Sequence, residues 1–194
     1  TTGGNNTVLG YDALGANTVG NSNVAIGTSA MLTNVAADKN VAVGLGTLQA
    51  MTSATTLDTY NTAVGYNAGA AVTTGVQNTI IGGLAGDALT TGQRNIAFGY
   101  GALSTDTTGQ YSVAIGYGAL QNQNFTGGQA SYNVAVGYDA GNDITTGDMN
   151  TLMGALTGDA LTTGSRNTVV GILALSAEDT GSRNTAFGYA ALGA

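Results

Sequence analysis

The side chains that most often carry out catalysis are scarce in this chain of 194 residues. Histidine and cysteine are absent, so the commonest general base and the thiol nucleophile are both missing. The acidic residues are scattered, and their near pairs are Asp139 with Asp143 and Glu178 with Asp179. Paired carboxylates are the machinery of glycoside hydrolysis. We expect these to be solvated carboxylates of turns, and therefore predict no enzymatic activity and no catalytic residue.

Glycine–aspartate pairs raise the possibility of a calcium site, since calcium binds six to eight oxygen ligands. Such pairs occur at Gly86-Asp87 and Gly158-Asp159. The calcium-binding nonapeptide repeat requires the pattern Gly-Gly-x-Gly-x-Asp, which this sequence lacks. Isolated pairs of this kind supply too few ligands, so we expect no bound metal and no cofactor.

Basic residues are even rarer than acidic ones. The net charge is −7, and the four basic residues are Lys39, Arg94, Arg166 and Arg183. Nucleic-acid binding needs a basic stripe and polybasic membrane attachment needs a basic cluster, so neither is expected. No run approaches the roughly 20 apolar residues of a membrane span, so membrane insertion is not expected either.

These side chains are positioned by a repeat that runs from one end of the chain to the other. Each copy consists of an asparagine, two small or β-branched residues, a bulky apolar residue and a glycine. The repeat glycines are Gly10, Gly27, Gly44, Gly65, Gly82, Gly99, Gly116, Gly137, Gly154, Gly171 and Gly188. Successive glycines are separated by a 17-residue interval, except for two 21-residue steps, from Gly44 to Gly65 and from Gly116 to Gly137. A fixed period of this length is typical of a solenoid, in which one repeat forms one turn.

We number each copy from its asparagine, as positions 1 to 17. Position 2 is Thr, Val or Ile in every copy and position 4 is always large and apolar, which favours short β-strands of about five residues. Glycine or an Asn-Thr pair interrupts every helical window. We therefore predict an all-β fold, a parallel β-solenoid (β-roll) of about eleven 17-residue turns that spans residues 1–194 as a single repetitive segment. With turns about 4.8 Å apart, the rod would be about 50 Å long.

Positions 9 and 12 vary together. Position 9 is Leu or Met in seven copies and glycine in the four others, at Gly69, Gly86, Gly141 and Gly158. In those four copies position 12 becomes Val72, Leu89, Ile144 or Leu161, whereas elsewhere it is mostly polar. We expect one pocket per turn that is filled from either side of a loop, because overfilling or emptying it would each be destabilising.

The sequence also has a longer period of 72 residues, since the segment 78–92 nearly matches the segment 150–164. The two 21-residue turns begin at Asn40 and Ser112, and their extra residues should project as loops within 49–59 and 121–131. Candidate ligand contacts in and beside these loops are Met51, Thr52, Thr55 and Tyr60 in the first, and Asn124, Phe125, Thr126 and Tyr132 in the second.

Two further columns follow from the repeat. Position 1 predicts a ladder of stacked amides, like those that stabilise cross-β stacks. Its members include Asn23, Asn40, Asn61, Asn78, Asn95, Asn133, Asn150, Asn167 and Asn184, with Ser112 as the exception. Position 6 is tyrosine in six copies, for which we expect packing beside the repeat glycine or, alternatively, an aromatic surface that stacks on sugars.

The strands read as apolar on both faces. Position 4 points to one side, and positions 3 and 5, which are mostly Ala and Gly, point to the other. Strands of this kind are buried on both sides. One face closes the interior of the turn, and we expect the small residues of the other to allow close approach by a second chain. The sequence therefore predicts a homo-oligomer, with a trimer favoured.

The repeat resembles known bacterial fibres. Residues 111–116 (Tyr-Ser-Val-Ala-Ile-Gly) and 23–27 (Asn-Val-Ala-Ile-Gly) resemble the head repeat of trimeric autotransporter adhesins. The longer unit at 184–192, with the Thr-Thr-Gly tails, looks like bacterial and phage tail-fibre repeats. This resemblance implies a left-handed β-roll, three chains around one axis, and a role in surface attachment outside the cell, on a cell surface or on a virion.

The leading hypothesis is a non-enzymatic structural segment of an attachment fibre, and we expect the chain to be a fragment of a longer fibre. A carbohydrate-binding adhesive module, contacting a cell-surface glycan or receptor through the loops and tyrosines, is the first alternative. A filament subunit stacked end to end is the second, because Ala194 at position 11 and Thr1 at position 13 would nearly continue the register. Ice binding by the tail threonines is a minor one, weakened because neighbouring threonines of a strand point to opposite faces.

Overall fold

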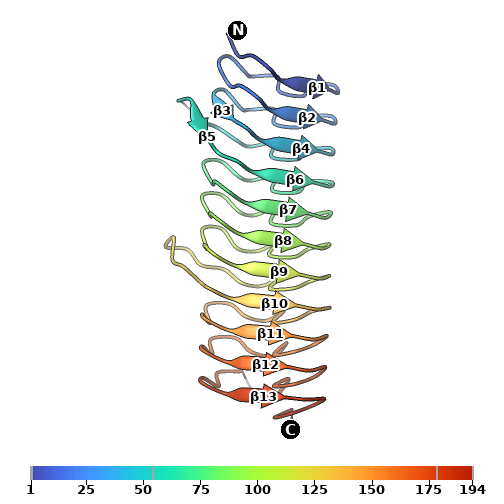
Figure 1. Ribbon diagram of the computed structural model, residues 1–194, viewed down its shortest axis with the longest axis vertical. Helices are drawn as coiled ribbons and strands as arrows, with labels where there is room; N and C mark the ends of the chain where they lie inside the picture. Colours follow the sequence, from blue (N-terminus) through green and yellow to red (C-terminus); the bar gives the residue numbers. More distant parts are fainter. Residues whose placement is uncertain (1, 54, 178, 194) are drawn as a thin grey trace.

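The computed structural model describes residues 2–53, 55–177 and 179–193 and shows a rod of stacked turns (Figure 1). Its main sheet has 11 strands, hydrogen-bonded in chain order. These strands are β1 (Thr7–Leu9), β2 (Val24–Ile26), β4 (Val41–Val43), β6 (Thr62–Val64), β7 (Thr79–Ile81), β8 (Ile96–Phe98), β9 (Val113–Ile115), β10 (Val134–Val136), β11 (Thr151–Met153), β12 (Thr168–Val170) and β13 (Thr185–Phe187). The predicted parallel β-solenoid of about eleven turns is confirmed. Thr1, Glu178 and Ala194, on which expectations above drew, lie outside the described residues.

Equivalent positions are stacked in register from turn to turn. Thr7 pairs with Val24, and the same alignment of position 2 holds across the long step from Val41 to Thr62. Each of these strands is shorter than expected, with three residues instead of about five, because sharp corners flank it. Position 17 adopts a φ between 49° and 61° in every turn, and the repeat glycine adopts a φ between 125° and 148°.

The glycine column is required by both backbone geometry and space. Gly65, for example, has a φ of +137°, which side-chain-bearing residues rarely adopt. A Cβ atom there would lie 2.5 Å from the carbonyl oxygen of Gly82 in the next turn, and the other repeat glycines with a following turn meet the same obstacle. The column therefore fixes the distance between turns.

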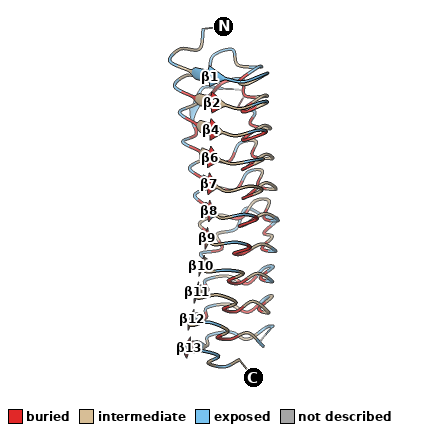
Figure 2. Ribbon diagram, turned by 90° about the vertical axis from the view of Figure 1, so that its right-hand side faces the viewer, coloured by how far each residue is buried: buried red, intermediate tan, exposed pale blue. Residues whose placement is uncertain are grey.

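The small residues of the strands face the interior, so the expectation that they would contact a second chain is wrong. Position 3 is buried in ten of the eleven turns, as at Ala25 and Ala114, whereas positions 2 and 4 point outward (Figure 2). The interior is thin, because so short a turn brings its opposite sides close together. Alanine at positions 3 and 8 leaves room for one large side chain per turn, such as Leu103 or Leu120.

The shared pocket at positions 9 and 12 is confirmed, since the large residue at one of these positions is fully buried in every turn except the first and the last, where Leu14 and Leu192 are 8% and 53% exposed. A third position takes part. A Cβ atom on Gly69 would lie 2.9 Å from Cδ1 of Ile80, and one on Gly141 would lie 2.8 Å from Cδ1 of Leu152. Glycine at position 9 thus makes room for Ile or Leu at position 3 of the next turn as well as for the apolar residue at position 12.

The two long turns project from the same side of the rod (Figure 1). In the first loop, residues 49–59, strand β5 (Leu57–Asp58) pairs with β3 (Ala37–Asp38) of the preceding turn. The second loop, residues 121–131, forms no such strand pair; an isolated β-bridge between Gln110 and Ala130 and hydrogen bonds such as Thr108 N–H to the Phe125 carbonyl join its described residues to the preceding turn. The extra residues therefore extend outward without shifting the stack below them.

Candidate functional site

The first loop offers few free groups for a ligand. Met51, one of the expected contacts, is fully buried, because it fills position 12 of its turn and completes the core. Thr52 and Thr55 are exposed, and Tyr60 is 50% exposed. Of the expected contacts this loop therefore presents two threonines and one tyrosine, and its exposed large apolar side chain is Leu57 rather than Met51.

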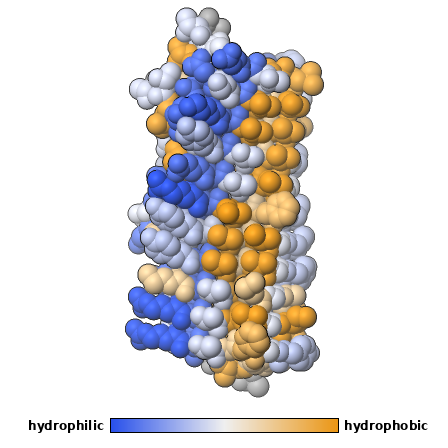
Figure 3. Space-filling view, viewed as in Figure 1, coloured by the Kyte–Doolittle hydropathy of each residue, from blue (hydrophilic) through white to orange (hydrophobic). Residues whose placement is uncertain are grey.

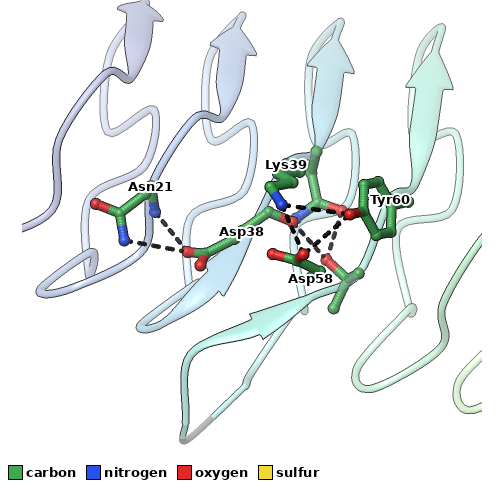
Figure 4. A network of polar contacts seen from close by, with 7 residues as sticks. Asn21, Asp38, Lys39, Asp58 and Tyr60 are labelled. Atoms are coloured by element: carbon green, nitrogen blue, oxygen red, sulfur yellow. Dashed lines mark hydrogen bonds and ion pairs between the residues drawn. The ribbon is translucent and has the colours of Figure 1, made fainter.

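Polar contacts clamp the first loop to the preceding turn (Figure 4). Lys39 Nζ lies 2.6 Å from Asp58 Oδ2, and the Tyr60 hydroxyl donates to the same oxygen at 2.9 Å. The Lys39 ammonium also lies 5.2 Å from the centre of the Tyr60 ring. The hydrogen bond between Lys39 and Asp58 raises the pKa of Lys39 and lowers the pKa of Asp58, so both groups stay charged at neutral pH. Tyr60 is thus occupied in holding the loop.

The second loop also differs from expectation. The Phe125 side chain is only 6% exposed, because it turns under the loop instead of away from it. Asn124 is half-buried, Thr126 is exposed and Tyr132 is 51% exposed. A shallow pocket of about 390 Å³ lies beside Phe125, between the loop and Asp148 of the following turn. Phe125 is a core residue of the loop, and its face is not available for stacking on a sugar.

A buried polar network supports the second loop. Gln123 Nε2 donates to Asp106 Oδ2 at 2.6 Å and to Ser112 Oγ at 2.7 Å. Gln123 Oε1 accepts from Asn133 Nδ2 at 2.8 Å, and the hydroxyls of Ser112 and Ser131 lie 2.6 Å apart. Burial raises the pKa of Asp106, although hydrogen bonds from Gln123 and from backbone amides oppose this. Ser112 stands at position 1 of this turn, where other turns have asparagine, and the Gln123 amide supplies the hydrogen-bonding group that is missing there.

The asparagine column forms a continuous ladder on either side of that exception. Each backbone N–H at position 1 donates to the side-chain oxygen of the preceding asparagine at 2.8–3.0 Å. In most turns the side-chain N–H₂ donates to the carbonyl oxygen of position 15, at 2.7–2.9 Å. Asn23, Asn40, Asn61, Asn78, Asn95, Asn133, Asn150 and Asn167 are buried, and Asn184 is half-buried. These amides satisfy one another and leave no group for a ligand.

The tyrosine column is exposed rather than packed beside the glycines. Tyr100, Tyr117 and Tyr138 lie in a stack, with ring centres 5.5 Å apart in each pair and planes inclined by 15° and 13°. Each of the three side chains is slightly more than half exposed. The stack stands at the ends of β8, β9 and β10, on the edge of the rod opposite the loops (Figure 1).

A pocket of about 350 Å³ opens beside the lower two tyrosines, and we call it the tyrosine pocket. Its lining residues come from positions 6, 7, 10 and 11 of three successive turns. They are Tyr117, Gln121, Tyr138, Asp139, Asn142, Asp143, Leu156 and Asp159. The carboxylates of Asp139 and Asp143, noted in the sequence as a near pair, meet there with Asp159.

The sequence alone did not point to this pocket. In the sequence Asp159 stands out only as part of a glycine–aspartate pair, and Gln121 and Asn142 carry no motif. A usable signal was present in the 72-residue period, because Asn142 and Asp143 replace Ala70 and Ala71 of the first unit. Among the described residues, no group of three or more acids, histidines or cysteines is placed to hold a metal ion.

The outward side of the main sheet is apolar and free of charge. We call it the outer strand face and define it by positions 2 and 4 of the 11 strands. Its most exposed large members are Leu9, Ile96, Phe98, Met153 and Phe187. Figure 3 shows this apolar band along the strands, bordered by a hydrophilic edge that carries position 17. With strands about 4.8 Å apart and three residues long, the face covers roughly 500 Å².

Comparisons with known proteins add no family to this description. The chain matches no family model. Searches of curated proteins and of solved structures likewise gave no match. In the described part of the chain, no helix is long and apolar enough to span a membrane.

Proposed function

We propose that this chain is a non-enzymatic structural segment of an extracellular attachment fibre, in which identical chains pack side by side through the outer strand face. The observation that carries the proposal is the size and character of that face. The face has a footprint of roughly 500 Å², in which position 4 is apolar in every strand and position 2 is Val, Ile or Thr; this is the size of the largest apolar patch on a typical monomer. Apolar patches of this kind usually mark protein–protein contact, and a second copy meets the same uncharged surface.

The outer strand face is suited to a symmetric assembly in which identical chains contact one another along the length of the rod. The face has no acidic or basic residue over 11 strands, so no buried charge opposes association. The four basic residues all stand at position 17, beside the face and not on it. Three chains around one axis, as the resemblance to trimeric adhesin heads and tail-fibre repeats implies, would cover the face on every chain. Rigidity would come from the asparagine ladder and the glycine column.

Lysine substitutions on the outer strand face test this proposal. Val113→Lys with Val134→Lys places two charges at position 2 of neighbouring strands, where the native side chains are half-buried. We expect the double variant to sediment as a smaller species than the wild type, with unchanged β-sheet circular dichroism. Gln77→Lys is the control, because position 17 carries Lys39 naturally. Equal sedimentation of the double variant and the wild type would contradict the proposal.

A second candidate function, glycan binding, is favoured by the exposed tyrosine stack. The inner ring faces stack on one another, so the surface offered to a sugar consists of the ring edges and the outer faces at the two ends of the stack. The loop version of this hypothesis loses support, because Phe125 is buried and Tyr60 is held by Lys39 and Asp58. A glycan array probed with the wild type and with Tyr100→Ala tests it: signal that falls in the variant supports binding by the stack, and unchanged signal opposes it.

Ice binding has less support from the geometry of the tail threonines. The Thr73 hydroxyl donates to the carbonyl oxygen of Thr90 at 3.1 Å, and the Thr90 hydroxyl donates to that of Thr107 at 2.9 Å. These hydroxyl groups join neighbouring turns. They are therefore not free donors for an ordered layer of water.

A further inference from the structure

The tyrosine pocket combines two aromatic side chains with a concentration of negative charge. Tyr117 and Tyr138 line one side of it; their side chains are about half exposed, and their rings stack on each other. The carboxylates of Asp139, Asp143 and Asp159 line the same space. Its volume of about 350 Å³ lies within the range of small-molecule sites, and is enough for one sugar unit.

The negative charge of the pocket has no counter-ion within the chain. All four basic side chains stand at position 17, at the starts of the strands, whereas the pocket is built from positions 6 to 11 beyond the strand ends. Asn142 donates to Asp139 at 3.3 Å, Asn122 donates to Asp143 at 3.1 Å, and the Tyr138 hydroxyl is also bonded to Asp139, so the partners of these two carboxylates are neutral groups.

Asp159 is the residue of the pocket that has a buried oxygen atom, Oδ1, without a hydrogen-bond partner among the described residues. Burial raises the pKa of Asp159, and the nearby charges of Asp143 and Asp139 raise it further. A buried acceptor without a donor is destabilising, and a ligand that brings N–H groups and positive charge would satisfy it.

The first 72-residue unit shows that the fold does not need these residues. The positions equivalent to Tyr117, Asp139 and Asp143 are occupied there by Leu45, Asn67 and Ala71. Asn142 is matched by Ala70 in the same way, whereas Tyr138, Gln121 and Asp159 are matched by Tyr66, Gln49 and Asp87. Both units stack in the same register around these positions. The extra aromatic ring, amide and carboxylates of the second unit therefore call for an explanation other than folding.

We infer that the tyrosine pocket binds an amino sugar, with the sugar ring against Tyr117 and Tyr138 and its protonated amine among Asp139, Asp143 and Asp159. An ammonium group interacts favourably with carboxylates and with aromatic rings, and the pocket beside the rings has the volume of one sugar unit. A metal ion is not proposed, because no group of three or more acids among the described residues is placed to hold one. The inference goes beyond the fibre role; it deepens the glycan-binding candidate and rests on it.

The experiment is a calorimetric titration of the chain with two matched probes, the β-1,4-linked tetramer of glucosamine and its fully N-acetylated form. We expect the amine form to bind at least tenfold more tightly, because acetylation removes the positive charge. Binding of the acetylated form alone would overturn the amino-sugar inference and leave glycan binding in place. No binding of either probe would overturn both. Tighter binding of a lysine-rich peptide than of the amine tetramer would instead assign the pocket to a protein partner and overturn the inference.

Two variants taken from the chain's own sequence locate the site. The variant Tyr117→Leu, Asp139→Asn, Asn142→Ala and Asp143→Ala copies the first unit, so we expect it to fold and to bind the amine tetramer at least tenfold more weakly. The reciprocal variant Leu45→Tyr, Asn67→Asp, Ala70→Asn and Ala71→Asp should raise the stoichiometry from one site to two. Unchanged affinity in the first variant, with an unchanged melting temperature, would overturn the inference.

Discussion

The two long turns occupy equivalent places in successive 72-residue units, and they hold their loops by different chemistry. In the first, the Asn40 side chain accepts from Thr59 Oγ1 at 2.7 Å and from the backbone of Asn61 at 3.0 Å, while Met51 fills the interior. In the second, Ser112 replaces the asparagine and Gln123 replaces the methionine. The buried amide has moved from position 1 to position 12.

The outer ends of the loops differ in the same way. In the first long turn, Lys39 lies over the Tyr60 ring and forms an ion pair with Asp58. In the second, the equivalent residues are Tyr111 and Tyr132, whose rings stack with centres 5.3 Å apart. The backbone register is the same in both. The comparison teaches that the glycine column and the strand register are the same in both units. The side chains that hold the loops differ, and residues that contact one another differ together.

The largest effect should come from breaking what the two turns share. Gly116→Ala places a Cβ atom against the carbonyl oxygen of Gly137, at a φ of +136°. We expect the free energy of unfolding to fall by more than about 3 kcal/mol, through strain and overlap with backbone. Gly101→Ala is the control, because its φ is also positive but no atom lies within 4 Å of the added Cβ. A loss of about 1 kcal/mol is expected there. Equal losses in urea denaturation would show that the column is not required for spacing.

The next largest effect should come from replacing one residue of the buried polar network without replacing the residues that contact it. Gln123→Met alone leaves the buried Asp106 without its side-chain donor, and should lower the free energy of unfolding by about 2–4 kcal/mol. The fourfold variant Asp106→Asn, Ser112→Asn, Gln123→Met and Ser131→Thr copies the first turn at these positions. Its stability in urea denaturation should return to within about 1 kcal/mol of the wild type. A fourfold variant as unstable as the single one would contradict the comparison.

A pH dependence distinguishes the same two turns. Burial raises the pKa of Asp106 above its unfolded value, so the folded state binds more protons than the unfolded state between these two pKa values. The stability of the wild type should therefore increase as the pH falls through the raised pKa, and the penalty should be fully present at neutral pH. The fourfold variant, which carries asparagine there as Asn34 does in the first unit, should lack this contribution. Identical pH profiles of thermal unfolding would contradict the assignment.

The smallest effect concerns the exposed clamp of the first loop. Lys39 and Asp58 are both well exposed, so salt should screen their attraction. We expect hydrogen exchange of the amide of Thr59, which donates to Asp38, to become faster in high salt. The amide of Ser131, which donates to Gln110 beside the stacked tyrosines, should be unaffected and serves as the internal control.

Much of the fold follows from the periodicity of the sequence. The spacing of the glycines predicts the number of turns, and the exchange between positions 9 and 12 predicts one pocket per turn. The direction of the strand faces was not predictable, because both faces are apolar and the thinness of the interior decides which one is buried. The prediction that Phe125 contacts a ligand was wrong, because a loop of this length has an apolar core of its own and Phe125 is buried in it.

The candidate site was harder to predict than the fold. Asp139 and Asp143 stand out as a pair in the sequence, but Tyr117 and Asp159 join them only because turns of unequal length stack in register. The exchange of Asn40 and Met51 for Ser112 and Gln123 was hidden for the same reason, since position 1 and position 12 meet only across the interior.

The mass of the wild-type particle in solution tests the central claim most directly. If the outer strand face joins identical chains into a three-fold fibre segment, native mass spectrometry should give three times the 19.0 kDa mass of one chain, and the trimer should persist on dilution. A folded particle of 19.0 kDa, stable at all concentrations with the outer strand face in solvent, would contradict it.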